Sequence, residues 1–358
     1  MSGPILIAAG GTGGHMFPAL ALGHALLARG RAVTLVTDRR GARYLDGALP
    51  CTIVSAGSPS GSMVARARGV AQLAKGAVEA FAALRRSRPA AAAAFGGYAS
   101  VPAALAAAAQ RVPLLVHEQN AVFGRANRLI ARCAHVLALS FEATAAVPNL
   151  PVSRLVTGNP TRPGFAAQIP VADPSRFRIL VLGGSQGARV FSDVVPAALA
   201  LLPADLAGRI ELAQQCRPED LERVRAAYAG QSLAVELAPF FADVAARMAA
   251  ADLVVTRSGA STVAELLALG RPSLLVPYFH AADDHQAANA RALAEAGAAV
   301  VIAQPAFTPE ALAEELVSLM LAPERRTAMQ AAARKLARPD AAERLADAVL
   351  HLAGEAGR

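Results

Sequence analysis

Two glycine-rich stretches carry the residues best suited to chemistry. The first, GGTGGH at residues 10–15, follows the apolar run ILIAA and ends in His15. The second, GGSQGA at residues 183–188, follows the apolar run RILVL in the same layout. Glycines at such a point let the backbone approach a ligand, and the free N–H groups of the following helix bind phosphate. An imidazole beside such a loop can take a proton from a hydroxyl group near neutral pH.

Each loop also has a purely structural interpretation, in which its glycines only allow a strand and a helix to pack tightly. For one loop alone that interpretation stays open, whereas two loops, one in each half of the chain, favour a bound ligand. His15 has the same two interpretations: it acts as a base, or it only caps and orients its loop.

A third stretch, RSGASTVAEL at residues 257–266, follows the apolar run DLVVT. Thr262 and Glu265 have the T-x-x-E spacing of a capping box, in which two side chains satisfy amide groups at the start of a helix. Alternatively, Glu265 lies in the first helical turn and accepts hydrogen bonds from sugar hydroxyls. The residue types alone leave both interpretations open.

The elements that position these residues alternate along the chain. Strands are predicted at residues 5–9, 33–37, 91–95, 113–117, 135–139, 178–182, 211–215, 252–256 and 273–277. Because these runs are apolar throughout and are separated by helix-like segments, they indicate parallel sheets covered on both faces. Residues 157–177, rich in proline and glycine, interrupt the pattern, which restarts at Ile179. A chain of 358 residues therefore folds as two Rossmann-like, doubly wound α/β domains.

Composition narrows the choice of partner and chemistry. The net charge of +8 favours an anionic ligand or surface. Nucleic acid is excluded because the basic residues are not interleaved with stacking aromatics and no reader motif occurs. A dehydrogenase loop would need a third glycine at Met16, although Asp38 stands where a ribose-binding acid belongs. The P-loop motif and Asp-x-Asp are both absent from the sequence, so neither a metal nor another cofactor is predicted.

Two segments bear on membranes. Residues 89–110 carry no charge over a bilayer-spanning length, but their glycines and proline predict a strand, a loop and a helix instead. Residues 64–88 combine six basic side chains with apolar ones. Such a helix either lies on anionic lipid or is an ordinary surface helix whose apolar face packs on the core.

Seven short motifs occur in order along nearly the whole chain: GGTGGH, FGGYAS, HEQNA, GNPTR, GGSQGA, RSGASTVAEL and DHQAANA. Together they resemble the MurG family, the family 28 glycosyltransferases that add N-acetylglucosamine to the lipid-linked muramoyl-pentapeptide of peptidoglycan. The resemblance implies the GT-B fold, with two Rossmann-like domains that face a cleft. Residues 1–160, with a last helix at about 338–358, would form the acceptor and membrane-facing domain. Residues 161–337 would bind the UDP-sugar.

The resemblance also implies roles for individual residues. Ser185 would contact the UDP phosphates, Arg162 would add positive charge, and the backbone near Phe241 would meet uracil. Gln286 would bond the transferred sugar, and Glu265 the ribose hydroxyls. The remaining nucleotide-binding residues would be Ala260, Ser261, Thr262, Val263 and Ala264, and those that approach the sugar from the other domain would be Thr12, Gly13, Gly14 and Asn120. His15 is the candidate base, Glu118 is held in reserve, and Tyr98 would position the acceptor.

The implied reaction moves N-acetylglucosamine from UDP-N-acetylglucosamine to the 4-hydroxyl of the muramoyl sugar in undecaprenyl-pyrophosphoryl-MurNAc-pentapeptide (lipid I). It inverts the anomeric carbon and forms lipid II without a metal or other cofactor. An enzyme with that acceptor would be peripheral to the cytoplasmic side of the inner membrane and would meet an anionic lipid surface.

Overall fold

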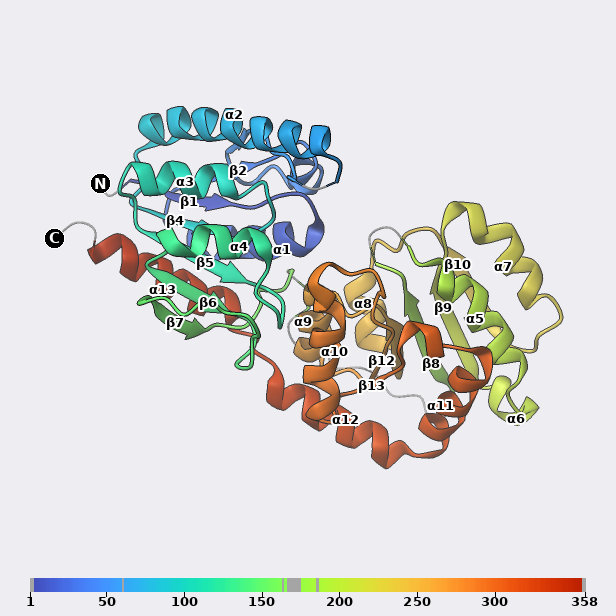
Figure 1. Cartoon of the computed structure of the whole chain (residues 1–358). Coiled ribbons are helices and arrows are strands. Elements are labelled where there is room, and N and C mark those ends of the chain that lie inside the picture. Colours follow the sequence, from blue (N-terminus) through green and yellow to red (C-terminus); the bar gives the residue numbers. More distant parts are fainter. Residues whose placement is uncertain (1–2, 60, 163, 166–174, 185–186, 356–358) are drawn as a thin grey trace. The chain divides into compact units, whose positions relative to one another are not determined.

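The computed structural model describes residues 3–59, 61–162, 164–165, 175–184 and 187–355 (Figure 1). The chain divides into two compact units. Unit 1 comprises Met1–Arg162 together with Arg338–Arg358, and unit 2 comprises Pro163–Ala337.

Within the described residues, unit 1 contains a seven-stranded parallel sheet in the order β3-β2-β1-β4-β5-β6-β7. Its strands are β1 (Ile5–Ala8), β2 (Val33–Thr37), β3 (Cys51–Ile53), β4 (Ala91–Ala94), β5 (Leu114–Glu118), β6 (Val136–Leu139) and β7 (Ser153–Val156). Its α-helices are α1 (Gly13–Ala28), α2 (Met63–Ser87), α3 (Val101–Ala109), α4 (Arg125–Ile130) and α13 (Ala341–Glu355). Two short 3₁₀ helices are η1 (Gly41–Tyr44) and η2 (Ala131–Cys133).

Strand β1 shows how the sheet of unit 1 separates two cores. Its side chains alternate between the faces of the sheet, as they do in any strand. Ile5 and Ile7 pack with residues of α1 and α13, while Leu6 and Ala8 pack with residues of α2, α3 and α4. The C-terminal helix α13 is thus part of unit 1, where it lies against α1 (Figure 1).

Unit 2 has, in its described part, a six-stranded parallel sheet in the order β10-β9-β8-β11-β12-β13. The strands are β8 (Phe177–Leu182), β9 (Ile210–Gln215), β10 (Ala234–Ala238), β11 (Leu253–Thr256), β12 (Ser273–Leu275) and β13 (Ala299–Val301). The α-helices are α5 (Arg189–Ala200), α6 (Ala204–Ala207), α7 (Leu221–Tyr228), α8 (Val244–Ala250), α9 (Ala260–Leu269), α10 (His285–Glu295), α11 (Pro309–Leu321) and α12 (Pro323–Leu336). The 3₁₀ helices are η3 (Pro218–Asp220), η4 (Ala282–Asp284) and η5 (Gln304–Ala306).

Every strand predicted from the sequence is present, and no strand begins or ends more than two residues away from its predicted position. The strands that the sequence analysis missed are β3, β7, β10 and β13, which form both edges of both sheets. An edge strand has a partner on one side only and is partly exposed, so its side chains need not be apolar. The SRLV stretch of β7, mostly exposed, illustrates this.

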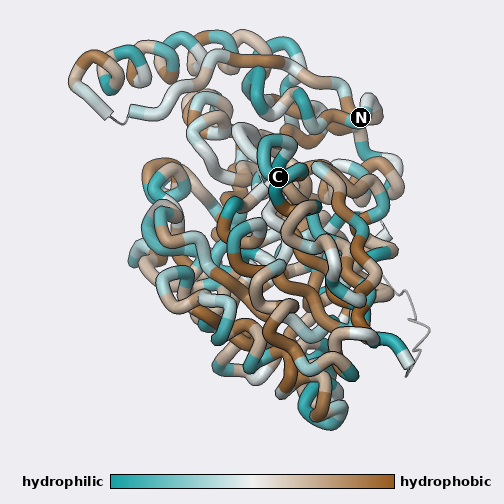
Figure 2. The backbone as a smooth tube through the Cα atoms, turned by 90° about the vertical axis from the view of Figure 1, so that its right-hand side faces the viewer, coloured by the Kyte–Doolittle hydropathy of each residue, from teal (hydrophilic) through white to brown (hydrophobic). Residues whose placement is uncertain are grey.

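The predicted helix at residues 64–88 is confirmed as α2, and it buries only part of its apolar surface. Leu84 is fully buried and Leu73 packs against the core. Val70 and Val78, by contrast, are 56% and 72% exposed. The helix at the top of Figure 2 accordingly carries hydrophobic and hydrophilic residues along its whole length.

The uncharged residues 89–110 form β4, a glycine loop and α3, as predicted. Among the residues that the structure describes, no helix combines the length and apolarity needed to cross a membrane.

The position of α13 leads to a first prediction. Leu345 of α13 is fully buried in the core that it shares with α1. The substitution Leu345→Ala is expected to lower the free energy of unfolding of unit 1 by about 2–5 kcal/mol, because it leaves a cavity. Hydrogen–deuterium exchange of peptides from β1 and β4 measures the change.

The matched control is Leu321→Ala, at a side chain that is 63% exposed. It is expected to change stability by less than about 0.5 kcal/mol. Equal effects of the two substitutions would contradict the packing of α13 in unit 1.

Candidate functional site

The candidate residues of unit 1 gather at the carboxyl ends of its central strands. Strand β1 pairs with β2 on one side and with β4 on the other. The connections that leave β1 and β4 therefore run in opposite directions, which creates the opening where open α/β sheets bind ligands. GGTGGH follows β1, FGGYAS follows β4 and HEQNA includes the end of β5.

Close packing holds the start of GGTGGH against neighbouring strands. A Cβ atom on Gly10 would lie 2.5 Å from Ala99 Cβ and 2.8 Å from Asp38 Oδ1, so only glycine fits. Asp38 Oδ1 accepts hydrogen bonds from the amides of Gly11 (2.9 Å) and Gly41 (2.8 Å). Its Oδ2 accepts one from Arg40 Nε (3.1 Å). Asp38 therefore anchors the loop, and this arrangement does not favour the ribose-binding role of a dehydrogenase.

The environment of Asp38 changes its pKa. Burial opposes ionisation, but the hydrogen bonds from Gly41, Gly11 and Arg40 outweigh it, so the pKa lies below its ordinary value. The carboxylate thus stays charged at neutral pH and keeps its three donors.

Helix α1 starts within the GGTGGH loop. Thr12 is its N-cap residue, and the amides of His15 and Met16 make the first hydrogen bonds, to Thr12 O. The N–H groups of Gly13 and Gly14 precede these bonds and belong to the turn in which helices bind anions. The Arg162 guanidinium lies 4.7 Å from the centre of the Phe17 ring, one turn into the same helix. This end of α1 is therefore electropositive.

His15, the candidate base, is half-buried and takes part in a chain of side chains. Its Nδ1 lies 2.9 Å from Gln119 Oε1. Gln119 Nε2 lies 2.9 Å from His117 Nδ1, and His117 Nε2 lies 3.0 Å from Gly158 O. His117 is the first residue of the HEQNA motif. The structure gives it a fully buried, hydrogen-bonding position behind His15.

Glu118, the reserve candidate for the base, is occupied by other contacts. It is 2% exposed, and its Oε1 accepts from the backbone and side-chain nitrogens of Asn120. Its Oε2 accepts from the amide of Gly124 and from Asn127 Nδ2, both at 2.8 Å. Four donors occupy the oxygens of this carboxylate, so the geometry favours His15 as the base. Glu118 organises the loop that carries Asn120.

Tyr98 packs in part against the core beneath α3. It belongs to the FGGYAS loop, in which Gly97 has φ +69° and lies next to the His15 ring. Tyr98 and His15 are thus brought to one edge of the sheet.

The second glycine loop lies at the corresponding edge of unit 2, after β8. Ser185, the predicted phosphate contact, falls outside the described residues. Gly183 packs so tightly that a Cβ would lie 2.3 Å from the amide of Ala188, the N-cap residue of α5. Gln215, at the end of β9, accepts from the amide of Gly183 (3.0 Å) and donates to Gly184 O (3.2 Å). Its side chain therefore fixes the first two residues of the loop.

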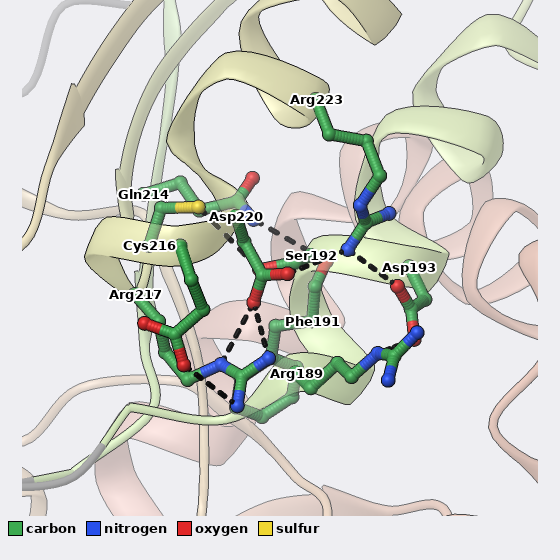
Figure 3. A network of polar contacts seen from close by, with 10 residues as sticks. Arg189, Phe191, Ser192, Asp193, Gln214, Cys216, Arg217, Asp220 and Arg223 are labelled. Atoms are coloured by element: carbon green, nitrogen blue, oxygen red, sulfur yellow. Dashed lines mark hydrogen bonds and ion pairs between the residues drawn. The ribbon is translucent and has the colours of Figure 1, made fainter.

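A cluster of charged residues ties α5 to η3 and α7 (Figure 3). Asp220 accepts from Arg217 (2.7 Å) and Arg223 (3.0 Å), and Arg223 also pairs with Asp193 of α5 (2.7 Å). The methylene groups of Arg217 lie against Gly187. These ion pairs fix the start of α5 relative to η3 and α7.

The capping-box interpretation of Thr262 and Glu265 is wrong. Helix α9 begins at Ala260, its N-cap residue is Gly259, and no side chain caps it. Thr262 therefore lies in the first turn, and Glu265 lies in the second turn instead of the first. Glu265 is 3% exposed, so it is a buried carboxylate on the inner side of the helix.

Within the same predicted nucleotide-binding stretch, Ala260 and Val263 are buried, whereas Ser261, Thr262 and Ala264 are half-buried. Their amides belong to the first turns of α9, which directly follows β11. The helix start therefore adds a second positive dipole end next to β8, since β8 and β11 are neighbours.

The loop before α9 is connected to the start of α10. Ser258 Oγ donates to Gln286 O (2.8 Å), and Asn289 Nδ2 donates to Ser258 O (3.0 Å). The Gln286 side chain accepts from the amide of Tyr278 at 2.9 Å. Gln286 is thereby held at the edge where β11 and β12 end.

The predicted uracil contact lies after β10. The Phe241 side chain is buried beneath Arg247, whose Cζ lies 4.3 Å from the ring centre, while the neighbouring Phe240 is 72% exposed. Packing of Phe241 fixes the backbone of this loop, which is the part predicted to meet the base.

Three residues of these sites were missed by the sequence analysis: Gln119, Gln215 and Arg217. Gln119 lies within a quoted motif and Gln215 ends a predicted strand. Polar residues at the carboxyl ends of buried strands are a signal that could have found both. Arg217 has no such signal, because its role depends on a close approach to Gly187.

No group of three or more histidine, cysteine, aspartate or glutamate side chains suited to a metal ion occurs in the described part of the chain. One hollow of about 380 Å³ in unit 2 is lined by the first residues of β8, β9 and β10. It lies toward the amino ends of these strands, away from the glycine loop.

Comparisons with known proteins agree with this arrangement. The model of the glycosyltransferase family 28 N-terminal domain matches residues 5–138, and that of the family 28 C-terminal domain matches residues 178–345. The UDP-N-acetylglucosamine–N-acetylmuramyl-(pentapeptide) pyrophosphoryl-undecaprenol N-acetylglucosamine transferase of Rhodospirillum centenum is 48% identical, over 98% of this chain and 95% of its own length. The protein of the same name from Methylorubrum populi is 51% identical, over 98% and 97%.

Solved structures give the same result. The crystal structure of Acinetobacter baumannii MurG matches with a TM-score of 0.81 and 30% identity, over 98% of this chain and 99% of that one. CalG4, the calicheamicin glycosyltransferase, matches with a TM-score of 0.71 and 18% identity over the whole of both chains. The latter likeness concerns the fold alone. Together they confirm the predicted GT-B class, with a parallel-sheet α/β domain in each unit.

The anchor at Asp38 leads to a second prediction. A carboxyl group whose pKa is lowered in the folded state stabilises the fold above its unfolded pKa, and the contribution is lost as the pH falls through the folded pKa. Asp38→Asn is therefore expected to destabilise unit 1 by about 1.5–3 kcal/mol at pH 7. The difference from the wild type narrows below about pH 4. Calorimetric unfolding across this pH range measures it.

Asp205→Asn, at an exposed position in α6, is the control and is expected to unfold like the wild type at every pH. A destabilisation by Asp38→Asn that did not change with pH would contradict the role of the charge.

Proposed function

Because this chain belongs to the UDP-N-acetylglucosamine–N-acetylmuramyl-(pentapeptide) pyrophosphoryl-undecaprenol N-acetylglucosamine transferases of glycosyltransferase family 28, we propose that it catalyses the reaction after which its relatives are named. N-acetylglucosamine moves from UDP-N-acetylglucosamine to the 4-hydroxyl of the muramoyl sugar of lipid I, and lipid II forms. The observation that carries this proposal is the identity of about half of all residues along 98% of the chain.

In this proposal unit 2 binds the donor. The starts of α5, α9 and α10 follow the adjacent strands β8, β11 and β12, so three positive dipole ends lie at one edge of the sheet. The pyrophosphate binds at α5 next to Ser185, uracil meets the backbone near Phe241, and Glu265 and Gln286 bind ribose and sugar. Fixed N–H donors and arginines stabilise the departing UDP by electrostatics.

Unit 1 supplies the base in the same proposal. His15 accepts the proton of the acceptor hydroxyl as the oxygen attacks the anomeric carbon, and the bond to UDP breaks on the opposite side. Thr12, Gly13, Gly14 and Asn120 contact the transferred sugar, Arg162 adds positive charge, and Tyr98 orients the acceptor. Attack from the opposite side inverts the configuration at the anomeric carbon.

The acceptor's lipid places the enzyme at a membrane, and we propose that α2 provides the contact, on the cytoplasmic side of the inner membrane. Four apolar side chains of α2 are more than half exposed: Met63 (86%), Val64 (72%), Val70 (56%) and Val78 (72%). The same helix carries six basic residues between positions 66 and 88, counting its C-cap residue Arg88. Apolar side chains among basic ones suit the headgroup region of anionic lipid.

A transfer assay tests the reaction. Labelled sugar is followed from UDP-N-acetylglucosamine to a short-chain lipid I analogue, with and without a chelator. The wild type is expected to transfer under both conditions. His15→Ala is expected to lower kcat about 10²–10⁴-fold, the usual contribution of a general base. Glu265→Gln is expected to raise the donor KM.

His24→Ala is the matched control, because His24 is partly exposed and pairs with Asp46 away from the candidate site. It is expected to retain the wild-type kcat. Tight UDP binding without any transfer by the folded wild type would instead indicate a UDP-sugar-binding module.

A vesicle assay tests the membrane contact separately. The double substitution Met63→Asp and Val64→Asp is expected to weaken binding to phosphatidylglycerol vesicles by at least about tenfold, because two apolar side chains become charges of the lipid's sign. Wild-type binding is expected to fall as salt rises. Co-sedimentation measures both effects.

The double substitution Leu201→Asp and Leu321→Asp, at side chains of unit 2 that are 55% and 63% exposed, provides the control with the same change in charge. If it weakened binding as much as the α2 variant, the membrane contact would not lie on α2.

A further inference from the structure

The side chain of Gln119 can adopt only one of its two amide orientations. One of its amide atoms lies 3.0 Å from the backbone carbonyl oxygen of His117, which can only accept a hydrogen bond. That atom must be the nitrogen, Nε2, since two oxygens at this distance would repel. The oxygen Oε1 consequently faces His15 Nδ1 at 2.9 Å.

The protons of His117 are determined in the same way. Its Nε2 lies 3.0 Å from Gly158 O, another group that only accepts, so Nε2 carries the proton. Its Nδ1 is then free to accept the second N–H of Gln119, at 2.9 Å. Because Gly158 O and His117 O can only accept, each hydrogen bond in the series that joins Gly158, His117, Gln119 and His15 has only one possible donor.

The same argument determines which nitrogen of His15 carries the proton. Because Gln119 Oε1 can only accept, His15 Nδ1 must donate to it and therefore carries the proton of the neutral ring. His15 Nε2 is left with its lone pair. This edge of the ring lies beside Gly97, where a Cβ atom would stand 3.1 Å from His15 Cδ2 and 3.5 Å from Nε2.

We propose that Gln119 and His117 are positioning residues that hold His15 in the Nδ1–H tautomer, so that Nε2 is the atom that receives the acceptor's proton. The inference rests on the proposed function, in which His15 is the base. It adds the identity of the reacting nitrogen and of the residues that select it. An imidazole in the other tautomer would present an N–H to the hydroxyl group and could not act as its base.

The surroundings keep this chain intact at working pH. Burial lowers the pKa of His117 to about 4. The neighbouring His15 also lowers this pKa, whereas the hydrogen bond to Gly158 O acts in the opposite direction. His117 thus remains neutral, and its Nδ1 remains an acceptor. The nearby carboxylates of Glu118 and Asp38 are engaged by other donors. Arg40, beside Gly11, and Arg162, over Phe17, are cations on this side.

Nuclear magnetic resonance of the full chain with ¹⁵N-labelled histidine tests the proposal without an activity measurement. Long-range proton–nitrogen correlations distinguish the protonated from the unprotonated nitrogen of each ring. At neutral pH we expect His15 to be protonated at Nδ1 and His117 at Nε2. A spectrum of His15→Ala assigns the His15 signals. An Nε2–H tautomer for His15 in the wild type would overturn the proposal.

Two substitutions at Gln119 test the cause. Gln119→Met keeps the length of the side chain but removes the acceptor, so His15 is expected to become a mixture of tautomers. The kcat is then expected to fall about tenfold to a hundredfold with an unchanged donor KM, less than the full loss of a base. Gln119→Glu keeps an acceptor for His15 Nδ1. Its other oxygen, opposite His117 O, must then carry a proton in place of the amide N–H, and the variant is expected to retain the Nδ1–H tautomer of His15.

Gln110→Met is the matched control, because Gln110 donates to Phe81 O at an exposed position of the same unit. It is expected to leave the His15 signals and kcat unchanged. Retention of the pure Nδ1–H tautomer in Gln119→Met would overturn the positioning role. If the tautomers behave as expected but His15→Ala retains full kcat, the base role in the proposed function fails while the hydrogen-bonded chain stands.

Discussion

The tight packing at two glycine positions is the constraint on which both candidate sites depend. At Gly10 a side chain would collide with Ala99 and Asp38, and at Gly183 it would collide with the amide of Ala188. In each unit the turn that follows the first strand of the sequence, β1 or β8, is tightly packed. The next helix therefore starts at the edge where the strands end. The N–H groups of that helix then face the opening between diverging connections. The arrangement repeats in both units because the same packing problem arises in both.

Charge at these edges follows from how the carboxylates are used. Asp38 accepts from two amides and Arg40, Glu118 accepts from four nitrogens in its own loop, and Asp220 pairs with two arginines. Each of these three carboxylates therefore holds a loop or a helix start. The helix ends and the remaining guanidinium groups provide an electropositive edge, which suits a ligand with a pyrophosphate. The structural and the binding roles of charge are thus divided between different residues.

The central strands could be predicted from the sequence because each is buried on both faces and reads as a continuous apolar run. The edge strands β3, β7, β10 and β13 could not, since their partly exposed side chains carry no such pattern. The motifs likewise located the loops but not the N-cap residue of α9, which is Gly259 instead of Thr262, so Glu265 lies in the second turn. The spacing of Thr262 and Glu265 in the sequence fits a capping box as well as it fits a ligand-binding role of Glu265. Only the position of Gly259 as the N-cap residue decides between the two.

The same limit explains why His15 could be selected from the sequence while its reacting nitrogen could not. The tautomer of His15 depends on Gln119, the orientation of Gln119 depends on the carbonyl of His117, and the proton of His117 depends on Gly158, 41 residues further along the chain. None of these dependences can be recognised from the spacing of residues in the sequence, because each requires a contact that exists only in the folded protein. Burial of His117 matters for the same reason: a ring that could take up a proton would lose its acceptor, and the direction of the chain would no longer be determined. His117, which stays neutral, therefore fixes one end of this series of hydrogen bonds, and the half-buried His15 is left to exchange protons.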